Sequence, residues 1–198
     1  MSSKFWNQRY SENETVYGKE PNLFFKFFID QHKPGTILLP SEGEGRNAIY
    51  AAKKGWKVDA FDFSSIAREK ALANAKAANV EINYEVKSVE TFTATKQYDA
   101  VSLIYVHVPA LIRKRFHQEV FKSIKPGGFL LLEAFAKEQL GLASGGPKDE
   151  TLLYDAPSLC QDFQYLHILN CEQKKIQLNE GNFHKGIAEV LRLKGQRI

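Results

Sequence analysis

Short apolar runs and segments with helical spacing follow one another along the first two thirds of the chain. Apolar residues that recur every three or four positions indicate helices, whereas short apolar runs bounded by glycine or proline indicate buried strands. The predicted strands occupy residues 36–39, 56–61, 82–86, 99–105 and 129–135. The predicted helices occupy residues 46–54, 66–78 and 109–124. Strands that alternate with helices predict a parallel sheet covered on both faces.

The last third of the chain departs from this alternation. A turn is predicted at 125–128, and a short helix is predicted at 157–163. Two further strands, at 165–174 and 186–193, are joined around 179–182 by a hairpin-type connection, which makes them antiparallel neighbours. We therefore predict an α/β, doubly wound, Rossmann-like fold with a seven-stranded, mostly parallel sheet and an antiparallel last strand. Such folds bind ligands beyond the carboxyl ends of the strands.

The composition is that of an ordinary globular protein. Of the 198 residues, 43% are hydrophobic and 25% are charged, which excludes disordered and fibrous classes and suits a single domain over 1–198. No apolar run approaches the roughly 20 residues that cross a bilayer, and the first ten residues lack the apolar stretch of a secretory signal.

The charge and the cysteines exclude further classes of partner. The net charge of +4 includes a basic run at 113–115 that fits a solvated helix face, so we expect neither a nucleic-acid nor a membrane partner. Cys160 and Cys171 show no metal-ligand spacing, and two isolated thiols fit a reducing cytoplasm. We expect a cytoplasmic protein that acts on a small molecule without a metal; nothing in the sequence requires an oligomer.

The segment 37–47 runs from a strand through a glycine turn into a helix. Gly43 and Gly45 allow a sharp turn and let a ligand approach the backbone closely. Asp62 follows Gly43 by 19 residues and ends the second strand. A carboxylate at that place accepts hydrogen bonds from both ribose hydroxyls of an adenosine. The order of strand, turn, helix, strand and acid therefore predicts a nucleoside site.

Two classes of cofactor compete for this site. The spacing of Gly43, Gly45 and Ala48 also satisfies the relaxed dinucleotide fingerprint, so NAD is an alternative. Glu42 and Glu44 would repel a pyrophosphate, whereas they favour the sulfonium and ammonium groups of S-adenosylmethionine. The other interpretation of these two glutamates is that they point to solvent. We expect S-adenosylmethionine as the cofactor.

Several motifs resemble those of class I S-adenosylmethionine-dependent methyltransferases, and in particular the branch of tellurite-resistance and thiopurine methyltransferases. The similar segments are 5–10, 16–22, 42–47, 61–64, 125–128, 145–148 and 180–186. Together they extend over nearly the whole chain. Three positions depart from the family pattern: Leu39 replaces an acid of the first strand, Ser41 replaces the first glycine of the turn, and Ser88 replaces an acid near the adenine.

The resemblance implies a set of cofactor residues. These are Trp6, Tyr17, Ser41, Glu42, Gly43, Gly45, Asn47, Asp62, Phe63, Ser88, Val89 and Tyr105. The turn would bind the methionine end of the cofactor, and Asp62 would bind the ribose. Phe63, Ser88 and Val89 would surround the adenine, and Tyr105 would face the methyl group. The amino-terminal segment 1–30, chiefly 6–22, would fold over the cofactor as a lid.

Methyl transfer from a sulfonium is an in-line displacement that depends on the proximity and alignment of the nucleophile. A thiol, with a pKa of about 8.5, needs little help from a general base. His107, just after the fourth strand, and His184, just before the last strand, are the candidate catalytic residues. Together with Tyr17 and Arg46 they are also the candidate substrate residues. For each histidine, a structural role in its loop is the alternative.

Three further predictions concern the surroundings of this site. Arg46 would bind an oxyanionic substrate or form an ion pair with Glu42 or Glu44 across the turn. The glycine-rich loop at 141–146 would be a mobile flap near the substrate opening. His117 is expected on a helix surface.

The predicted function is methylation of a small soft nucleophile, a thiol or a chalcogen oxyanion such as tellurite, by S-adenosylmethionine. One alternative is methylation of another small metabolite at oxygen or nitrogen. The other alternative is a protein that binds the cofactor without transferring a methyl group. Activity on thiols separates the first two, whereas cofactor binding without turnover indicates the third.

Overall fold

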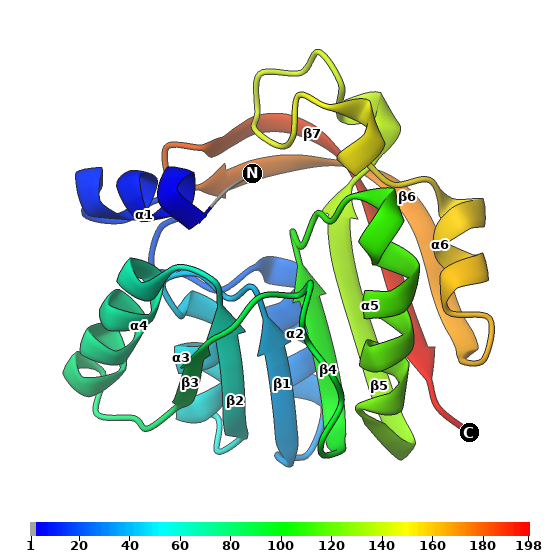
Figure 1. Ribbon diagram of the computed structural model, residues 1–198, viewed down its shortest axis with the longest axis horizontal. Helices are drawn as coiled ribbons and strands as arrows, with labels where there is room; N and C mark the ends of the chain where they lie inside the picture. Colours follow the sequence, from blue (N-terminus) through cyan, green and yellow to red (C-terminus); the bar gives the residue numbers. More distant parts are fainter. Residues whose placement is uncertain (1–2) are drawn as a thin grey trace.

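The computed structural model describes residues 3–198 and shows a seven-stranded sheet with helices on both faces (Figure 1). The strands are β1 (Thr36–Pro40), β2 (Lys57–Asp62), β3 (Asn83–Val86), β4 (Tyr98–Ile104), β5 (Ile124–Phe135), β6 (His167–Glu180) and β7 (His184–Gln196). The helices are α1 (Ser3–Glu12), α2 (Leu23–Gln31), α3 (Arg46–Lys53), α4 (Ser65–Ala77), α5 (Ala110–Lys122) and α6 (Ala156–Asp162), with the short 3-10 turns η1 (Lys137–Gln139) and η2 (Glu150–Leu152). The first four predicted strands are present with ends shifted by at most one residue.

The strand order is β3-β2-β1-β4-β5-β7-β6. The strands β1 to β5 are parallel, whereas β7 lies between β5 and β6 and is antiparallel to both. The predicted fold class, including the antiparallel last strand, is confirmed. The chain order reverses between β1 and β4, and a crevice at such a point, outside the carboxyl ends of the strands, is where open α/β sheets bind ligands.

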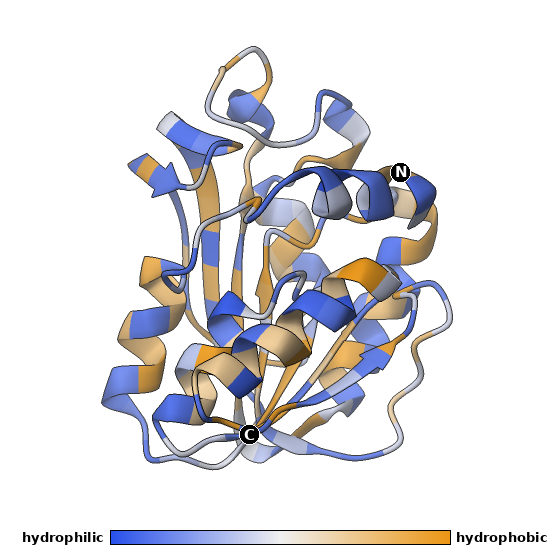
Figure 2. Cartoon of the chain, turned by 90° about the vertical axis from the view of Figure 1, so that its left-hand side faces the viewer, coloured by the Kyte–Doolittle hydropathy of each residue, from blue (hydrophilic) through white to orange (hydrophobic). Residues whose placement is uncertain are grey.

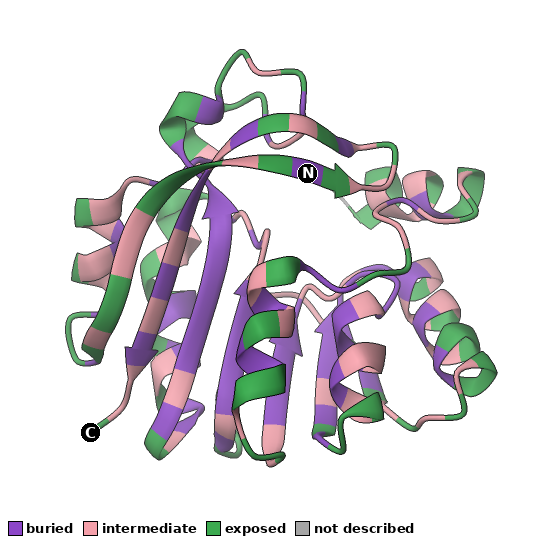
Figure 3. Ribbon diagram, turned by 180° about the vertical axis from the view of Figure 1, so that it is seen from behind, coloured by how far each residue is buried: buried purple, intermediate pink, exposed green. Residues whose placement is uncertain are grey.

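Side chains that alternate along the strands build two apolar layers. Ile37 and Leu39 of β1 belong to the cluster that contains Phe28 of α2, the buried alanines of α3 and Ala71 of α4. Leu38 belongs to the opposite cluster, with Phe116 of α5 and the buried side of α6. The central strands are therefore buried on both faces (Figure 3), and hydrophobic residues are concentrated in them (Figure 2). This rigid sheet positions the loops at its carboxyl edge.

The predicted amino-terminal lid divides into two parts. Helix α1 lies beside α4 and near the tip of the β6–β7 hairpin, above the strand ends (Figure 1). Helix α2 instead packs on the sheet through Phe25, Phe28 and Ile29, so residues 23–30 are not part of a lid. The side chain of Asn22 accepts the Phe25 N–H at 3.0 Å and begins α2. Residues 1–2 lie outside the described residues.

The predicted turn at 125–128 is wrong, because β5 continues through it with a register shift against β4. Gly127 has a φ of 78°, and its N–H donates to the Arg197 carbonyl at 2.6 Å. Pairing with the carboxyl-terminal residues therefore keeps this glycine segment in the sheet. Strands β6 and β7 are also longer than predicted, with 14 and 13 residues, because their exposed polar positions hide the alternation.

The prediction for His117 is also wrong, because its side chain is buried between α5 and α6. The ring stacks on Phe163, with centroids 4.6 Å apart, and Nδ1 lies 2.9 Å from an Asp162 carboxylate oxygen. Within residues 3–198, no helix has both the length and the apolarity to cross a membrane.

Candidate active site

A cavity of about 780 Å³ lies at the carboxyl edge of the sheet, below α1 and the hairpin. Of the residues predicted for the cofactor or the substrate, all but Gly45 line it. These residues are Trp6, Tyr17, Ser41, Glu42, Gly43, Arg46, Asn47, Asp62, Phe63, Ser88, Val89, Tyr105, His107 and His184. The fold thus brings together residues that are up to 178 positions apart in the sequence. The loop predicted as a flap also lies at the cavity, through Ala143, Gly145 and Gly146.

The glycine turn depends on left-handed backbone at three positions. Ser41, Gly43 and Gly45 have φ angles of 53°, 64° and 85°. A Cβ on Gly43 would lie 2.7 Å from the Tyr10 hydroxyl, so the absence of a side chain there lets α1 approach the turn. A Cβ on Gly45 would instead meet Ala71 of α4 at 2.9 Å. Gly45 therefore serves helix packing.

The two glutamates of the turn are both bonded within the protein, and the interpretation that they point to solvent is wrong. Glu42 accepts the Ala48 N–H at 2.8 Å at the start of α3, and burial raises the pKa of its carboxyl to about 7. Glu44 is buried, accepts the Val16 N–H at 2.8 Å and pairs with Lys70 at 3.0 Å. Glu42 is thus the acid of the turn that faces the cavity.

Asp62 ends β2 as a buried carboxylate at the cavity. One oxygen accepts the Ser64 N–H at 2.9 Å, and the other accepts the Gly43 N–H at 3.2 Å. Burial raises the pKa of Asp62 to about 6, although these backbone donors oppose the shift. Each carboxylate oxygen has a second acceptor position, so the residue retains the capacity to bind a pair of hydroxyls.

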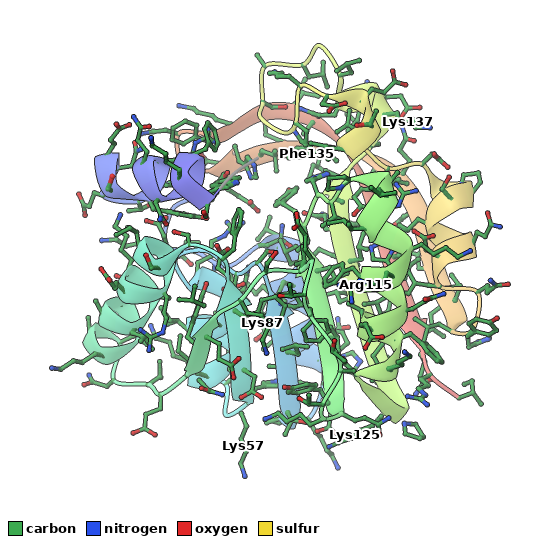
Figure 4. All side chains as sticks on the ribbon, in the orientation of Figure 1. Lys57, Lys87, Arg115, Lys125, Phe135 and Lys137 are labelled. Carbon is green, nitrogen blue, oxygen red and sulfur yellow. The ribbon has the colours of Figure 1, made fainter. Side chains whose placement is uncertain are left out.

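Aromatic rings form the wall of the cavity at the ends of β4 and β5. Tyr105 has a φ of 55° and stacks on Phe135 with ring centroids 4.7 Å apart. His184 lies 4.6 Å from the Tyr105 ring and 4.4 Å from the Tyr17 ring. Figure 4 labels Phe135 at the end of β5, below the hairpin. We call Tyr17, Tyr105, His107, Phe135 and His184 the aromatic wall.

The two candidate catalytic histidines differ in their bonding. Nδ1 of His107 donates to the Leu152 carbonyl at 2.8 Å, and Nε2 accepts the Phe135 N–H at 3.3 Å. Burial lowers the pKa of His107 to about 4, so the ring is a neutral structural element of the wall. His184 begins β7 and is 5% exposed, with Nδ1 3.6 Å from a carboxylate oxygen of Glu180.

Arg46 does not pair with Glu42 or Glu44, and that prediction is wrong. Its guanidinium binds Glu180 at 2.7 Å, with the side chains only 10% and 12% exposed. The same guanidinium donates to the carbonyls of Tyr17 and Glu20 at 3.2 and 3.3 Å. Arg46 therefore joins the start of α3 to the segment between α1 and α2 and to the hairpin.

Sequence reasoning missed a buried polar network beside this ion pair. The Asn22 amide donates to Glu133 at 2.6 Å and to Glu180 at 3.0 Å, and Arg192 binds the other oxygen of Glu133 at 2.6 Å. Glu133 is fully buried. The only signal of this network in the sequence is Glu133, an acid inside the otherwise apolar strand β5. Its partners Asn22 and Arg192 come from distant segments, so the sequence does not indicate them.

Asn47 has a structural role in the same region. Its side-chain oxygen accepts the Asn22 N–H at 2.9 Å, and its amide donates to Glu42 at 3.3 Å. Asn47 thus connects Asn22, at the start of α2, to the glycine turn.

Residues 38–128, which include the turn, Asp62 and the end of β4, match the family model of the methyltransferase domain. This segment of the chain is thus similar to the methyltransferase domain. The cofactor predicted from the turn and Asp62, S-adenosylmethionine, agrees with this family. The matching segment contributes the turn and Asp62 to the cavity at the switch point of the sheet.

One curated relative of this chain is the ubiquinone biosynthesis O-methyltransferase of Rickettsia akari, which is 31% identical over 129 residues. The match covers 64% of this chain and 51% of the relative, so the chain spans about half the length of that protein. The fold of this chain is similar to that of TehB from Haemophilus influenzae, with a TM-score of 0.77 and 12% sequence identity. The match covers 99% of this chain and 67% of TehB.

A second solved structure of similar fold is the N-methyltransferase NodS from Bradyrhizobium japonicum in complex with S-adenosyl-L-homocysteine. Its TM-score is 0.74 with 12% identity, and the match covers 100% of this chain and 99% of NodS. At these identities the two likenesses show the fold alone.

Proposed function

We propose that this protein transfers a methyl group from S-adenosylmethionine to a small soft nucleophile, a thiol or a chalcogen oxyanion such as tellurite. The observation that carries the proposal is the bonding of His107 at the aromatic wall. Because main-chain groups occupy both of its nitrogens, this histidine has no free position for a proton from the acceptor. An acceptor that ionises near neutral pH, as a thiol does at a pKa of about 8.5, needs no such base.

The residues of the cavity fit S-adenosylmethionine. The cofactor supplies a methyl group that its sulfonium has already activated. Asp62 would bind the ribose hydroxyls through the free acceptor positions of its two oxygens. Glu42 adds negative charge on the side of the turn, which suits the ammonium and sulfonium groups. Gly43 leaves the space that a Cβ would fill between the turn and Tyr10.

The remaining cavity residues position the acceptor and exclude water. Phe63, Ser88 and Val89 would border the adenine. Tyr105 and Phe135 would align an apolar acceptor, since a displacement depends chiefly on proximity and orientation. We propose that residues 1–198 form one domain, with the segment 3–22 as the lid.

Methylation at oxygen is the second candidate, and two observations favour it. The curated relative that matches 64% of this chain is named an O-methyltransferase. His184, beside the Glu180 carboxylate at 3.6 Å, is the side chain of the wall that could accept a proton from a hydroxyl.

Calorimetric titration followed by an acceptor screen tests both candidates. We expect S-adenosylmethionine and S-adenosylhomocysteine to bind with micromolar-order affinity, about −8 kcal/mol, and NAD not to bind. Asp62→Ala should lose this binding while its thermal unfolding stays cooperative. Turnover of thiols or tellurite supports the first candidate, and turnover of phenols alone supports the second. NAD binding would overturn both, and cofactor binding without any turnover would indicate a protein that only binds the cofactor.

A further inference from the structure

Arg9 on α1 lines the cavity without an acidic partner. Within residues 3–198, no aspartate or glutamate forms an ion pair with its guanidinium at 4 Å or less. The other arginine that lines the cavity, Arg46, has Glu180 at 2.7 Å. A cation that is partly withdrawn from water and has no anion in its own chain is available to an anionic ligand.

Three aromatic rings hold the Arg9 guanidinium in place. Its central carbon lies 4.6 Å from the Phe5 ring centroid, 5.1 Å from that of Trp6 and 4.7 Å from that of Phe183. Phe183 belongs to the hairpin, so Arg9 lies where α1 and the hairpin meet. Rings that stack on a guanidinium cover its faces. The edge of the Arg9 guanidinium donates a hydrogen bond to the Tyr17 side chain, and its remaining N–H groups are available to an oxyanion.

The charge of Arg9 acts on the aromatic wall. Burial raises the pKa of Tyr17, and the neighbouring Arg9 guanidinium opposes this shift. Burial lowers the pKa of His184, and Arg9 contributes to the shift in the same direction. Arg9 therefore lies on the side of the cavity where the proposed function places the acceptor.

A second cation borders the same cavity from the opposite element. Lys148, two residues after the glycine-rich loop, donates to the Leu142 carbonyl at 3.2 Å. The carboxylate next to it in the sequence, Asp149, is engaged by the Thr151 N–H at 2.9 Å and hydroxyl at 2.7 Å. Of the basic side chains that line the cavity, Arg46 and Lys87 are paired with acids, whereas Arg9 and Lys148 form no ion pair at 4 Å or less within the described residues.

We infer that Arg9 binds a carboxylate or similar planar oxyanion carried by the methyl acceptor, so that the acceptor is an anionic molecule with an apolar, ring-like body. The inference rests on the proposed function, because it concerns the acceptor of that same site. Arg9 would act as a specificity residue, donating from the guanidinium edge to the anion while the aromatic wall contacts the body. The carboxylate of the cofactor has the same chemistry as a carboxylate of the acceptor. The experiment therefore has to show which of the two carboxylates Arg9 binds.

The test measures binding to the protein saturated with S-adenosylhomocysteine, which carries no transferable methyl group. The probes are 4-mercaptobenzoate and 4-mercaptobenzamide, which have the same shape and differ in charge. Calorimetry is performed on the wild type, Arg9→Met, Arg9→Lys and Lys4→Met. Lys4 is the matched control, because it is an exposed cation on the same helix that does not line the cavity.

We expect the wild type and Lys4→Met to bind the benzoate about tenfold or more tightly than the amide, as a charge-assisted hydrogen bond provides. Arg9→Met should bind both probes equally, Arg9→Lys should retain part of the preference, and all variants should bind S-adenosylhomocysteine alike. Equal binding of the two probes by the wild type would overturn the inference. So would a loss of S-adenosylhomocysteine affinity in Arg9→Met with the preference unchanged, since Arg9 would then bind the cofactor.

Methyl transfer to the thiol is measured separately on the same proteins. If no thiol is methylated but the preference for the benzoate depends on Arg9, the proposed transfer to thiols fails and the anion site stands. Failure of the proposed methyl transfer to thiols can therefore be distinguished from failure of the inferred anion site at Arg9.

Discussion

Single residues around the cavity hold backbone conformations that L-amino acids rarely adopt. Ser41 and Tyr105 have φ angles of 53° and 55° without being glycine. Such residues cost about 1 kcal/mol or more each and persist where the surrounding structure requires them. Ser41 occupies the position at which the resembling family has a glycine, so this chain reaches the same turn with a strained serine.

The contact between Gly43 and Tyr10 gives a prediction at the residue scale. Gly43→Ala should weaken the binding of S-adenosylhomocysteine about tenfold or more, because a Cβ would lie 2.7 Å from the Tyr10 hydroxyl and push α1 from the turn. Gly127→Ala is the matched control, since Gly127 has a similar φ of 78° but nothing within 4 Å of its Cβ position. Gly127→Ala should lose about 1 kcal/mol of unfolding free energy because of its left-handed backbone, and Gly43→Ala should lose more because of the added clash. Equal affinities in calorimetry would contradict the role of this contact.

The raised pKa values of Asp62 and Glu42, about 6 and about 7, predict a pH dependence. The ionised carboxylates accept hydroxyls and attract the ammonium group, so the affinity for S-adenosylhomocysteine should rise from pH 5 to pH 8. In the ligand-free protein, the unfolding free energy should change with pH in the opposite direction to the affinity. Both folded pKa values exceed the unfolded ones, near 4, so this contribution to the unfolding free energy should fall as pH rises through about 4 to 7.

Titrations at several pH values, with chemical denaturation at the same values, check this prediction. Asp62→Asn removes one of the two groups and should flatten the lower part of the affinity profile. A dissociation constant that does not change between pH 5 and pH 8 would show that neither carboxylate titrates in this range.

Among the elements, the hairpin and the lid depend on one another. Gly181, at the hairpin tip, would bring a Cβ within 2.6 Å of the Val16 carbonyl, so the two backbones are in direct contact. Arg46 binds the Tyr17 and Glu20 carbonyls as well as Glu180. The segment between α1 and α2 is therefore held between the hairpin and the start of α3.

Removing Arg46 should separate these elements. Arg46→Met leaves Glu180 buried without its cation, and we expect a loss of about 3 kcal/mol or more in the free energy of unfolding by urea. Lys19→Met is the control, because its pair with Glu14 is 75% and 89% exposed and contributes at most about 1 kcal/mol. A loss no larger than that of the control would show that the buried pair does not stabilise the contact of lid and hairpin.

At the scale of the whole molecule, the site exists because parallel strands end at one edge. The turn after β1, Asp62 of β2, Tyr105 after β4 and Phe135 of β5 meet there although they are far apart in sequence. The antiparallel β7 then carries His184 back over the same edge. No single segment holds the cavity, and its volume is a property of the assembled sheet, lid and hairpin.

The sequence by itself determined the alternation of strands and helices, the parallel sheet and the pairing of the glycine turn with Asp62. These features are local, since the period of apolar residues and the φ requirement of glycine act within a few positions. The order of elements then leaves few topologies. All of the predicted cofactor and substrate residues except Gly45 consequently line the cavity.

The tertiary structure alone decided which partners the polar side chains take. Arg46 binds Glu180 and not the nearer glutamates of its own turn, His117 is buried against Phe163, and the segment 125–128 remains in the sheet through Arg197. Each of these contacts joins elements distant in sequence, and each depends on how the layers pack. A local pattern shows which side of an element is apolar, but not which distant group will lie within hydrogen-bond distance of a polar one.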